Sequence, residues 1–135
     1  MKARKNLSTK TLCLLYHIFA YPYLIFGNII WGANYRSNIS KLLIFQKKMV
    51  RIISFSNYYA HTKELFQRLH ILKIQDIHSF QTSIFMFKYL SNLLPLDLFE
   101  YYFETNDAFH HYFTRNHSSL HMIKCKSNRR KFSIK

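Results

Sequence analysis

Residues 11–35 contain no charged side chain, although the chain of 135 residues has a formal net charge of +14. Within this stretch, 12–31 is mostly apolar and long enough to cross a bilayer as one helix, at about 1.5 Å per residue. His17, Pro22 and Asn28 interrupt the apolar run, and basic residues flank both of its ends. The run therefore forms either a buried pair of helices or a single membrane span, and its interruptions favour the buried pair.

The first helix of this pair is expected to begin at Ser8 or Thr9, because both residues are good N-caps. Pro22 lacks a backbone donor and clashes with the preceding turn, so we expect it to kink or restart the helix. The second piece, 23–31, is expected to end at Gly32, where glycine can adopt the left-handed cap conformation.

Glycine and proline are scarce throughout, with 2 of each. Folds with many tight turns and glycine-rich phosphate loops are therefore disfavoured. Hydrophobic residues make up 49% of the chain, which is enough apolar surface to offset the entropy of folding. The sequence predicts an all-α domain of about four to six helices, without a sheet of three or more strands.

The segment 38–54 has the clearest helical pattern, with Ser37 or Asn38 as the expected cap. The residues that recur at helical spacing on one face are Ile39, Leu42, Leu43, Gln46, Met49, Val50 and Ile53. On a helical wheel the opposite face holds Lys41, Lys47, Lys48 and Arg51. This basic face is either an ordinary solvated surface or a surface that contacts the phosphates of a nucleic-acid backbone. The helix contains no acid that could pair with its basic residues, which favours the contact with phosphates.

Further helices are expected from Thr62 and over 75–91, ending before Pro95 because the residue before proline avoids the helical region. The first of these has Glu64 in its first turn and an apolar stripe of Leu65, Phe66, Leu69 and Leu72. A short helix is expected over 96–103. The polar sequence that follows predicts a helical domain over 1–103 and a basic, extended or disordered tail over 104–135.

The charges are distributed unevenly. Residues 1–63 hold ten basic and no acidic residues, 64–107 hold all six acids, and 108–135 hold seven basic and no acidic residues. This asymmetry indicates that the two outer segments contact an anionic partner.

Sequence motifs of catalysis are absent. The chain contains no phosphate-binding GxxxxGK[ST] loop, no GxGxxG, no GxSxG and no HExxH. Asp97, Glu100 and Glu104 share a helical spacing, but no companion carboxylate is placed to complete a two-metal site. We therefore expect no catalytic residue, no metal site and no cofactor, and we expect that the isolated chain is not an enzyme.

An ordered series of short motifs runs from about residue 10 to the end of the chain. It comprises Leu15-Tyr16-His17, Pro22-Tyr23-Leu24, Gly27-Asn28-Ile29-Ile30-Trp31-Gly32, Gln46-Lys47-Lys48, Val50-Arg51-Ile52-Ile53, His61-Thr62, Ile71-Leu72-Lys73, Leu94-Pro95, His111-Tyr112 and Thr114-Arg115. This series resembles the region that follows the polymerase core in reverse transcriptases of jockey-like non-LTR retrotransposons. The palm aspartates and the endonuclease domain of that family have no counterpart in these residues.

The resemblance implies a fragment of an RNA-directed DNA polymerase, covering its thumb and the connector that follows. Such a fragment is expected to bind the backbone of an RNA–DNA or DNA duplex in the nucleus or cytoplasm and not to polymerise. The rest of a reverse transcriptase is a second expected partner. The expected nucleic-acid-binding residues are Lys41, Lys47, Lys48, Arg51, Arg115, Arg129, Arg130 and Lys131. The alternative is a small single-span membrane protein, with its span at 12–31 and basic flanks.

Overall fold

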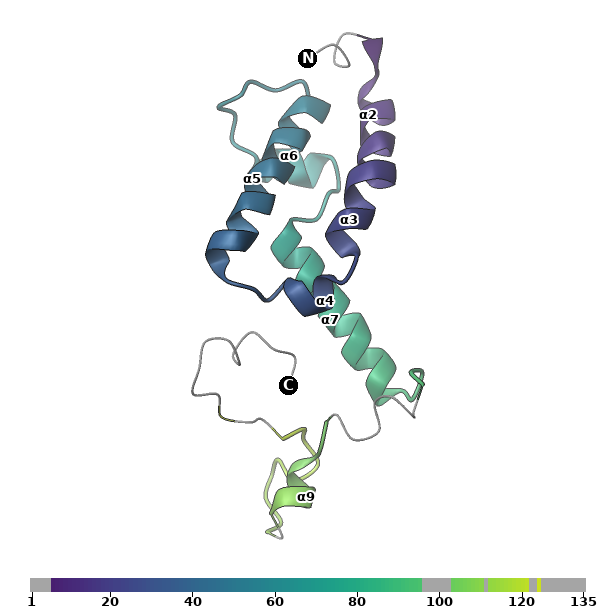
Figure 1. Cartoon of the computed structure of the whole chain (residues 1–135), viewed down its shortest axis with the longest axis vertical. Coiled ribbons are helices and arrows are strands. Elements are labelled where there is room, and N and C mark those ends of the chain that lie inside the picture. The colour runs from purple at the N-terminus through teal and green to yellow at the C-terminus, as the bar shows by residue number, and fades with distance from the viewer. Residues whose placement is uncertain (1–5, 96–102, 111, 122–123, 125–135) are drawn as a thin grey trace. The chain divides into compact units, whose positions relative to one another are not determined.

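The computed structural model describes residues 6–95, 103–110, 112–121 and 124. The described residues form helices and no strand, apart from one isolated antiparallel bridge between Thr105 and Leu120, which confirms the all-α prediction. The elements in chain order are α2 (Thr9–Leu15), the π-helical turn η1 (Tyr16–Ala20), α3 (Tyr21–Ile25), α4 (Asn28–Trp31), α5 (Arg36–Ile53), α6 (Lys63–Arg68), α7 (Ile74–Leu90) and α9 (Asn106–Phe109) (Figure 1).

The chain divides into two compact units, Met1–Thr82 and Ser83–Lys135. The first holds α2 to α6 and the first half of α7, and it contains the hydrophobic core. The boundary after residue 103 that the composition predicts stays a prediction.

The elements α2, η1 and α3 follow one another without a break, and we call them the first column. Ser8 is the N-cap, as predicted, and its side chain accepts a hydrogen bond from the backbone N–H of Thr11. Pro22 lies in the first turn of α3, so the prediction that it restarts the helix is confirmed. The turn before it is π-helical, and the Tyr21 N–H bonds to the Tyr16 carbonyl five residues back. This wider turn accommodates a residue that cannot donate a backbone hydrogen bond.

The two glycines differ from their predicted roles. Gly27 has φ +60° and separates α3 from α4, a break within 23–31 that was not predicted. Gly32 was expected to be left-handed, but its φ is −67°, so that prediction is wrong. The structure instead needs Gly32 for space, because a Cβ there would lie 2.5 Å from the Asn28 carbonyl oxygen and would also collide with His78.

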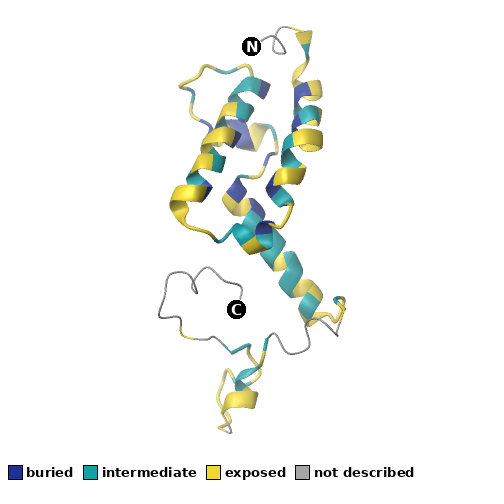
Figure 2. Ribbon diagram, in the orientation of Figure 1, coloured by how far each residue is buried: buried dark blue, intermediate teal, exposed yellow. Residues whose placement is uncertain are grey.

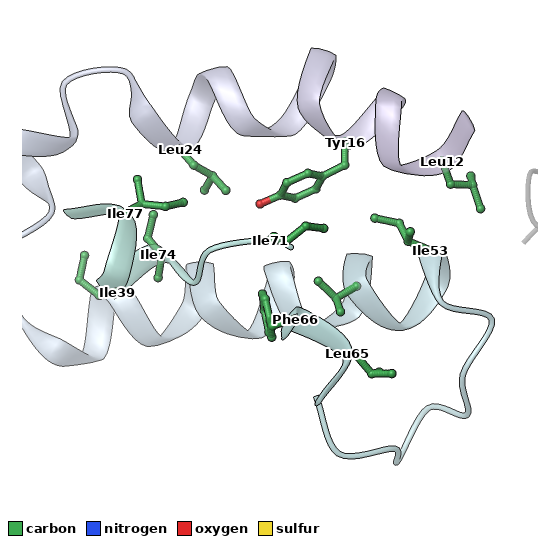
Figure 3. Packing of buried hydrophobic residues seen from close by; sticks show 11 residues of the cluster. Leu12, Tyr16, Leu24, Ile39, Ile53, Leu65, Phe66, Ile71, Ile74 and Ile77 are labelled. Atoms are coloured by element: carbon green, nitrogen blue, oxygen red, sulfur yellow. The ribbon is translucent and has the colours of Figure 1, made fainter. Parts of the chain in front are cut away.

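α5 runs antiparallel to the first column, and α6 and the start of α7 pack against this pair (Figure 1). Figure 3 shows Leu12, Tyr16 and Leu24 pointing from the first column into the core. The other members of the buried cluster are Ile39, Val50, Ile53, Leu65, Phe66, Ile71, Ile74 and Ile77. Each buried apolar side chain of this size stabilises the fold by about 1.5–3 kcal/mol. Among the described residues, none of the helices is both long and apolar enough to cross a membrane.

A buried glutamine joins three segments inside this core. Gln46, on α5, is only 1% exposed. Its Nε2 donates to the Tyr16 hydroxyl at 2.9 Å and to the Leu72 carbonyl at 2.7 Å, and its Oε1 accepts from the Ile74 N–H at 3.0 Å. Both ends of the amide are thus satisfied, which removes the cost of burying it.

Three helices end on a non-glycine residue in the left-handed conformation: Phe55 after α5, His70 after α6 and Asn92 after α7. At each end the next residue donates its N–H to the carbonyl five positions back, as the Ile71 N–H does to Phe66. This is the Schellman cap, in which glycine is the usual residue. With only 2 glycines in the chain, these caps use residues that pay a steric cost.

The later helices match the sequence with small differences. α6 and α7 lie within one residue of their expected starts. Leu72 was expected in the apolar stripe of α6, but it is 45% exposed and follows the α6 cap, so this prediction is wrong. The short helix expected over 96–103 falls almost wholly outside the described residues.

Residues 103–110 and 112–121 of the second unit are joined by backbone hydrogen bonds. The His121 N–H donates to the Glu104 carbonyl at 2.8 Å, and the Asn106 N–H donates to the Ser119 carbonyl at 2.9 Å. A short helix, α9, begins at Asn106, directly after its N-cap Thr105. Residues 125–135 of the predicted tail lie outside the described part of the chain.

Candidate nucleic-acid interface

α5 is a single helix of 18 residues because its sequence contains no glycine or proline and repeats apolar residues at helical spacing. Its N-cap is Tyr35, and Ser37 and Asn38 lie inside the first turn, so the predicted caps are wrong. Asn34, one residue before the cap, accepts the Tyr35 N–H at 2.6 Å and positions the chain for entry into the helix.

The inner face of α5 is as predicted. Ile39, Gln46, Val50 and Ile53 are buried, and the other predicted members of this face, Leu42, Leu43 and Met49, are half-buried. Packing of this face fixes the rotation of the helix about its axis. The outer face is consequently determined as well, and it faces away from the core (Figure 2).

The four basic residues of α5 are not equally exposed. Lys41 and Lys48 are exposed, whereas Lys47 and Arg51 are half-buried on the flanks of the helix. Arg51 also has a structural contact, because its Nε donates to the Ala60 carbonyl at 3.0 Å. That bond uses one of the five guanidinium N–H groups and ties α5 to the loop that follows it.

Among the described residues, no carboxylate pairs with these lysines. In the part of the chain that the structure describes, Lys41, Lys47 and Lys48 have neither an ion pair nor a hydrogen bond. The unit Met1–Thr82 holds twelve Lys and Arg residues against two acids, Glu64 and Asp76. An anion that approaches α5 therefore meets ammonium groups that no described acid already neutralises.

The outer face of α5 also carries two apolar residues that the wheel argument overlooked. Ile44 is 53% exposed and Phe45 is 58% exposed. The sequence held the signal, since both positions fall outside the inner stripe at 100° per residue. The basic face is thus mixed, with lysines interspersed among apolar side chains.

A hollow of about 580 Å³ between α6 and the start of α7 adds basic residues that the sequence did not single out. Lys63, His70 and Lys73 line it together with Asp76, and Phe66 and Ile71 are among its apolar lining residues. Gln46 fixes the segment between α6 and α7, because its side chain is hydrogen-bonded to the backbone on both sides of Lys73, at Leu72 and Ile74. Only the tertiary fold brings Lys63 and Lys73 to one hollow, ten residues apart in the sequence.

Arg115 and Lys124, in the second unit, are exposed. The other predicted contacts of the C-terminal region, Arg129, Arg130 and Lys131, lie outside the described residues. The expected interface residues therefore divide between α5 in the first unit, Arg115 in the second and a distal group outside the described residues.

Two pKa values are shifted by local structure. Burial raises the pKa of the Tyr16 hydroxyl above 10.0, although the hydrogen bond from Gln46 opposes this shift. A side-chain hydrogen bond from Thr105 is the main cause that lowers the pKa of the exposed Asp107 carboxyl. Neither group lies among the basic residues of α5.

Among the described residues, no three His, Cys, Asp or Glu side chains gather as a metal-binding group. The arrangement on α5 instead offers ammonium groups without a described acidic partner on one continuous helix, which suits contacts to phosphates. Comparison of the chain with protein-family models, with curated proteins and with solved structures finds no match.

Proposed function

We propose that this chain binds the backbone of nucleic-acid duplexes without regard to sequence, as a non-catalytic fragment of a retrotransposon-type reverse transcriptase. The observation that carries the proposal is the basic outer side of α5, whose Lys41, Lys47 and Lys48 have no acidic partner among the described residues. The order of the short motifs supplies the link to the polymerase family. For the alternative, a membrane span at 12–31, no observation on the described residues gives specific support.

The electrostatics support phosphate binding over an ordinary solvated surface. Surface lysines commonly pair with acids at one helical turn, and α5 has no acid to pair with. Each lysine that neutralises a phosphate releases condensed counterions and changes the slope of log K against log salt by about −0.9 on B-DNA. Several such contacts give tight binding at low salt and weak binding at high salt.

The first column supports the idea of a part of a larger protein. Several of its apolar residues, and its C-cap Phe26, are more than half exposed: Leu14, Ile18, Phe19, Tyr23 and Phe26. Apolar surface of this extent on a small domain is typical of an interface. The rest of a polymerase is the partner that the family resemblance suggests for it.

The test replaces Lys41, Lys47 and Lys48 by glutamine and measures binding to a DNA and an RNA–DNA duplex across a salt series. Arg51 stays unchanged, because its bond to Ala60 is structural. We expect the salt slope to flatten by about two to three units if all three lysines touch phosphates. Helix content measured by circular dichroism should stay the same, because glutamine is a good helix former.

The matched control removes the same charge elsewhere, by replacing Arg129, Arg130 and Lys131 with glutamine. A smaller change in slope for this control supports a specific role of α5. An equal change in both variants would indicate a diffuse effect of net charge, and an unchanged slope in the α5 variant would contradict the proposal.

A further inference from the structure

Residues 112–117, which we call the aromatic loop, project from a base that is hydrogen-bonded on both sides. The Asp107 N–H donates to the His117 carbonyl at 3.1 Å, and the Asn106 side chain donates to the Asn116 carbonyl at 2.9 Å. His121 Nδ1 lies 3.0 Å from Asn106 Oδ1. The start of α9 and the second half of the loop therefore hold each other in place.

Stacked rings reinforce both the base and the tip of this loop. At the base, the Phe109 and His121 rings lie 4.0 Å apart between centroids and 22° from parallel. At the tip, Phe113 and His117 stack at 4.6 Å and 27°. The second pair orients the Phe113 ring and leaves its other face without a stacking partner among the described residues.

The tip exposes more aromatic surface than a folded chain normally does. Phe113 is 93% exposed and Tyr112 is 80% exposed. Arg115, two residues after Phe113, is also exposed, and no acid occurs from residue 108 to the end of the chain. An exposed aromatic pair beside a guanidinium that has no ion pair among the described residues suits a partner with flat rings and negative charge; the acid nearest in sequence, Asp107, lies at the base of the loop.

We propose that the aromatic loop stacks on unpaired nucleobases, with Phe113 and Tyr112 contacting base faces and Arg115 contacting the adjacent phosphate. This inference rests on the proposed function and deepens it, because it adds a preference for single-stranded segments to duplex binding. Every base has a flat face, so the stacking is tolerant of sequence. The positive charge of Arg115 disfavours a basic protein surface as the partner.

The experiment uses the full chain and a single-stranded DNA oligonucleotide that contains 2-aminopurine, whose fluorescence is quenched by stacking. The same oligonucleotide paired into a blunt duplex is the comparison. The double variant Tyr112→Ala with Phe113→Ala should bind the single strand about 10- to 100-fold more weakly and lose the fluorescence change. Its affinity for the duplex and the salt slope on the duplex should be unchanged.

Two variants guard against trivial explanations. Phe113→Tyr keeps the ring and should retain the fluorescence change of the wild-type chain. Tyr59→Ala removes an aromatic residue that is 84% exposed in the first unit and should affect neither substrate. A similar loss for Tyr59→Ala would show that exposed aromatics act without regard to position.

Three outcomes overturn the inference. Unchanged single-strand binding in the double variant, with duplex binding intact, contradicts the aromatic loop and leaves the proposed function standing. Equal losses on single strand and duplex contradict stacking on unpaired bases. If the wild-type chain binds neither substrate at low salt, both the inference and the proposed function fail.

Discussion

The first column and α5 contribute to the same core, yet their outer sides differ in chemistry. Leu12, Tyr16 and Leu24 of the column and Ile39, Val50 and Ile53 of α5 are buried together. On the outer side, α5 presents lysines that have no ion pair among the described residues, interspersed with Ile44 and Phe45, whereas the column and its C-cap present apolar residues such as Phe19 and Phe26. Burial of an inner face thus explains why both segments are helical, and only the outer side suggests what each contacts.

The two segments also differ in continuity. α5 has no glycine or proline and is unbroken over 18 residues. The stretch from Thr9 to Trp31 has a π-helical turn before Pro22 and a left-handed break at Gly27. The column is therefore held in position by tertiary contacts to a greater extent than α5, since short helical pieces are not stable by themselves.

The largest expected effect comes from the residue that joins the two segments. Replacement of Gln46 by leucine removes three hydrogen bonds and leaves the Tyr16 hydroxyl and the Ile74 N–H buried without partners. We expect the free energy of unfolding, measured with urea, to fall by about 3 kcal/mol. Gln67→Leu, at an exposed position of α6, should change it by less than about 0.5 kcal/mol.

A double-mutant cycle sharpens this prediction. Tyr16→Phe alone should cost about 1 kcal/mol, because it removes a single hydrogen bond. In the Gln46→Leu background the same change should cost nothing or even stabilise the fold, since the hydroxyl already lacks its partner. Additive costs would show that the bond between Tyr16 and Gln46 does not form in solution.

Periodicity predicted the inner face of α5 correctly because burial of an apolar stripe depends only on spacing along one helix. It placed the helix start two residues late, because Ser37 and Asn38 are good caps in isolation while Asn34 makes the entry contact instead. It listed Gln46 among core positions, but its three partners come from segments far away in sequence and were not predictable from spacing.

The candidate site was less predictable than the fold. The wheel named Lys41, Lys47 and Lys48 correctly as residues outside the core, but the bond of Arg51 to Ala60 depends on how the loop after α5 folds. The hollow that Lys63 and Lys73 share arises where Gln46 holds the connector between α6 and α7. Such juxtapositions come from tertiary contacts that a single sequence does not display.

The next largest effect distinguishes the two glycines that shape the end of the column. Gly32→Ala should cost about 2 kcal/mol, because its Cβ would meet the Asn28 backbone oxygen at 2.5 Å, and the backbone cannot give way as a side chain does. Gly27→Ala should cost about 1 kcal/mol, because alanine is strained at φ +60° but its Cβ would make only ordinary van der Waals contact with the Trp31 side chain. Urea unfolding measures both.

Substitution by asparagine distinguishes backbone strain at Gly27 from steric collision at Gly32. Asparagine tolerates the left-handed conformation better than alanine does, so Gly27→Asn should be milder than Gly27→Ala. At position 32 the larger side chain worsens the collision, so Gly32→Asn should be more damaging than Gly32→Ala. The same order of alanine and asparagine at both positions would refute this distinction.

The smallest effect on stability is expected on the outer side of the column, where the comparison with α5 is tested most directly. We replace Leu14, Ile18 and Phe26 by glutamine, at positions that are 58%, 53% and 84% exposed. Because these side chains contribute little to the core, each change should alter the free energy of unfolding by less than about 0.5 kcal/mol. Self-association, followed by sedimentation across a concentration series, should decrease as the apolar surface is removed.

The lysine variant of α5 is the matched control for the apolar variant, because the two are expected to change different properties. Lys41→Gln, Lys47→Gln and Lys48→Gln together should flatten the salt slope of nucleic-acid binding and leave self-association no weaker, since lower net charge reduces repulsion between copies. The apolar variant should weaken self-association and keep the salt slope. A loss of more than about 2 kcal/mol in the apolar variant would mean that the outer side of the column is packed in solution, and the contrast with α5 would then be wrong.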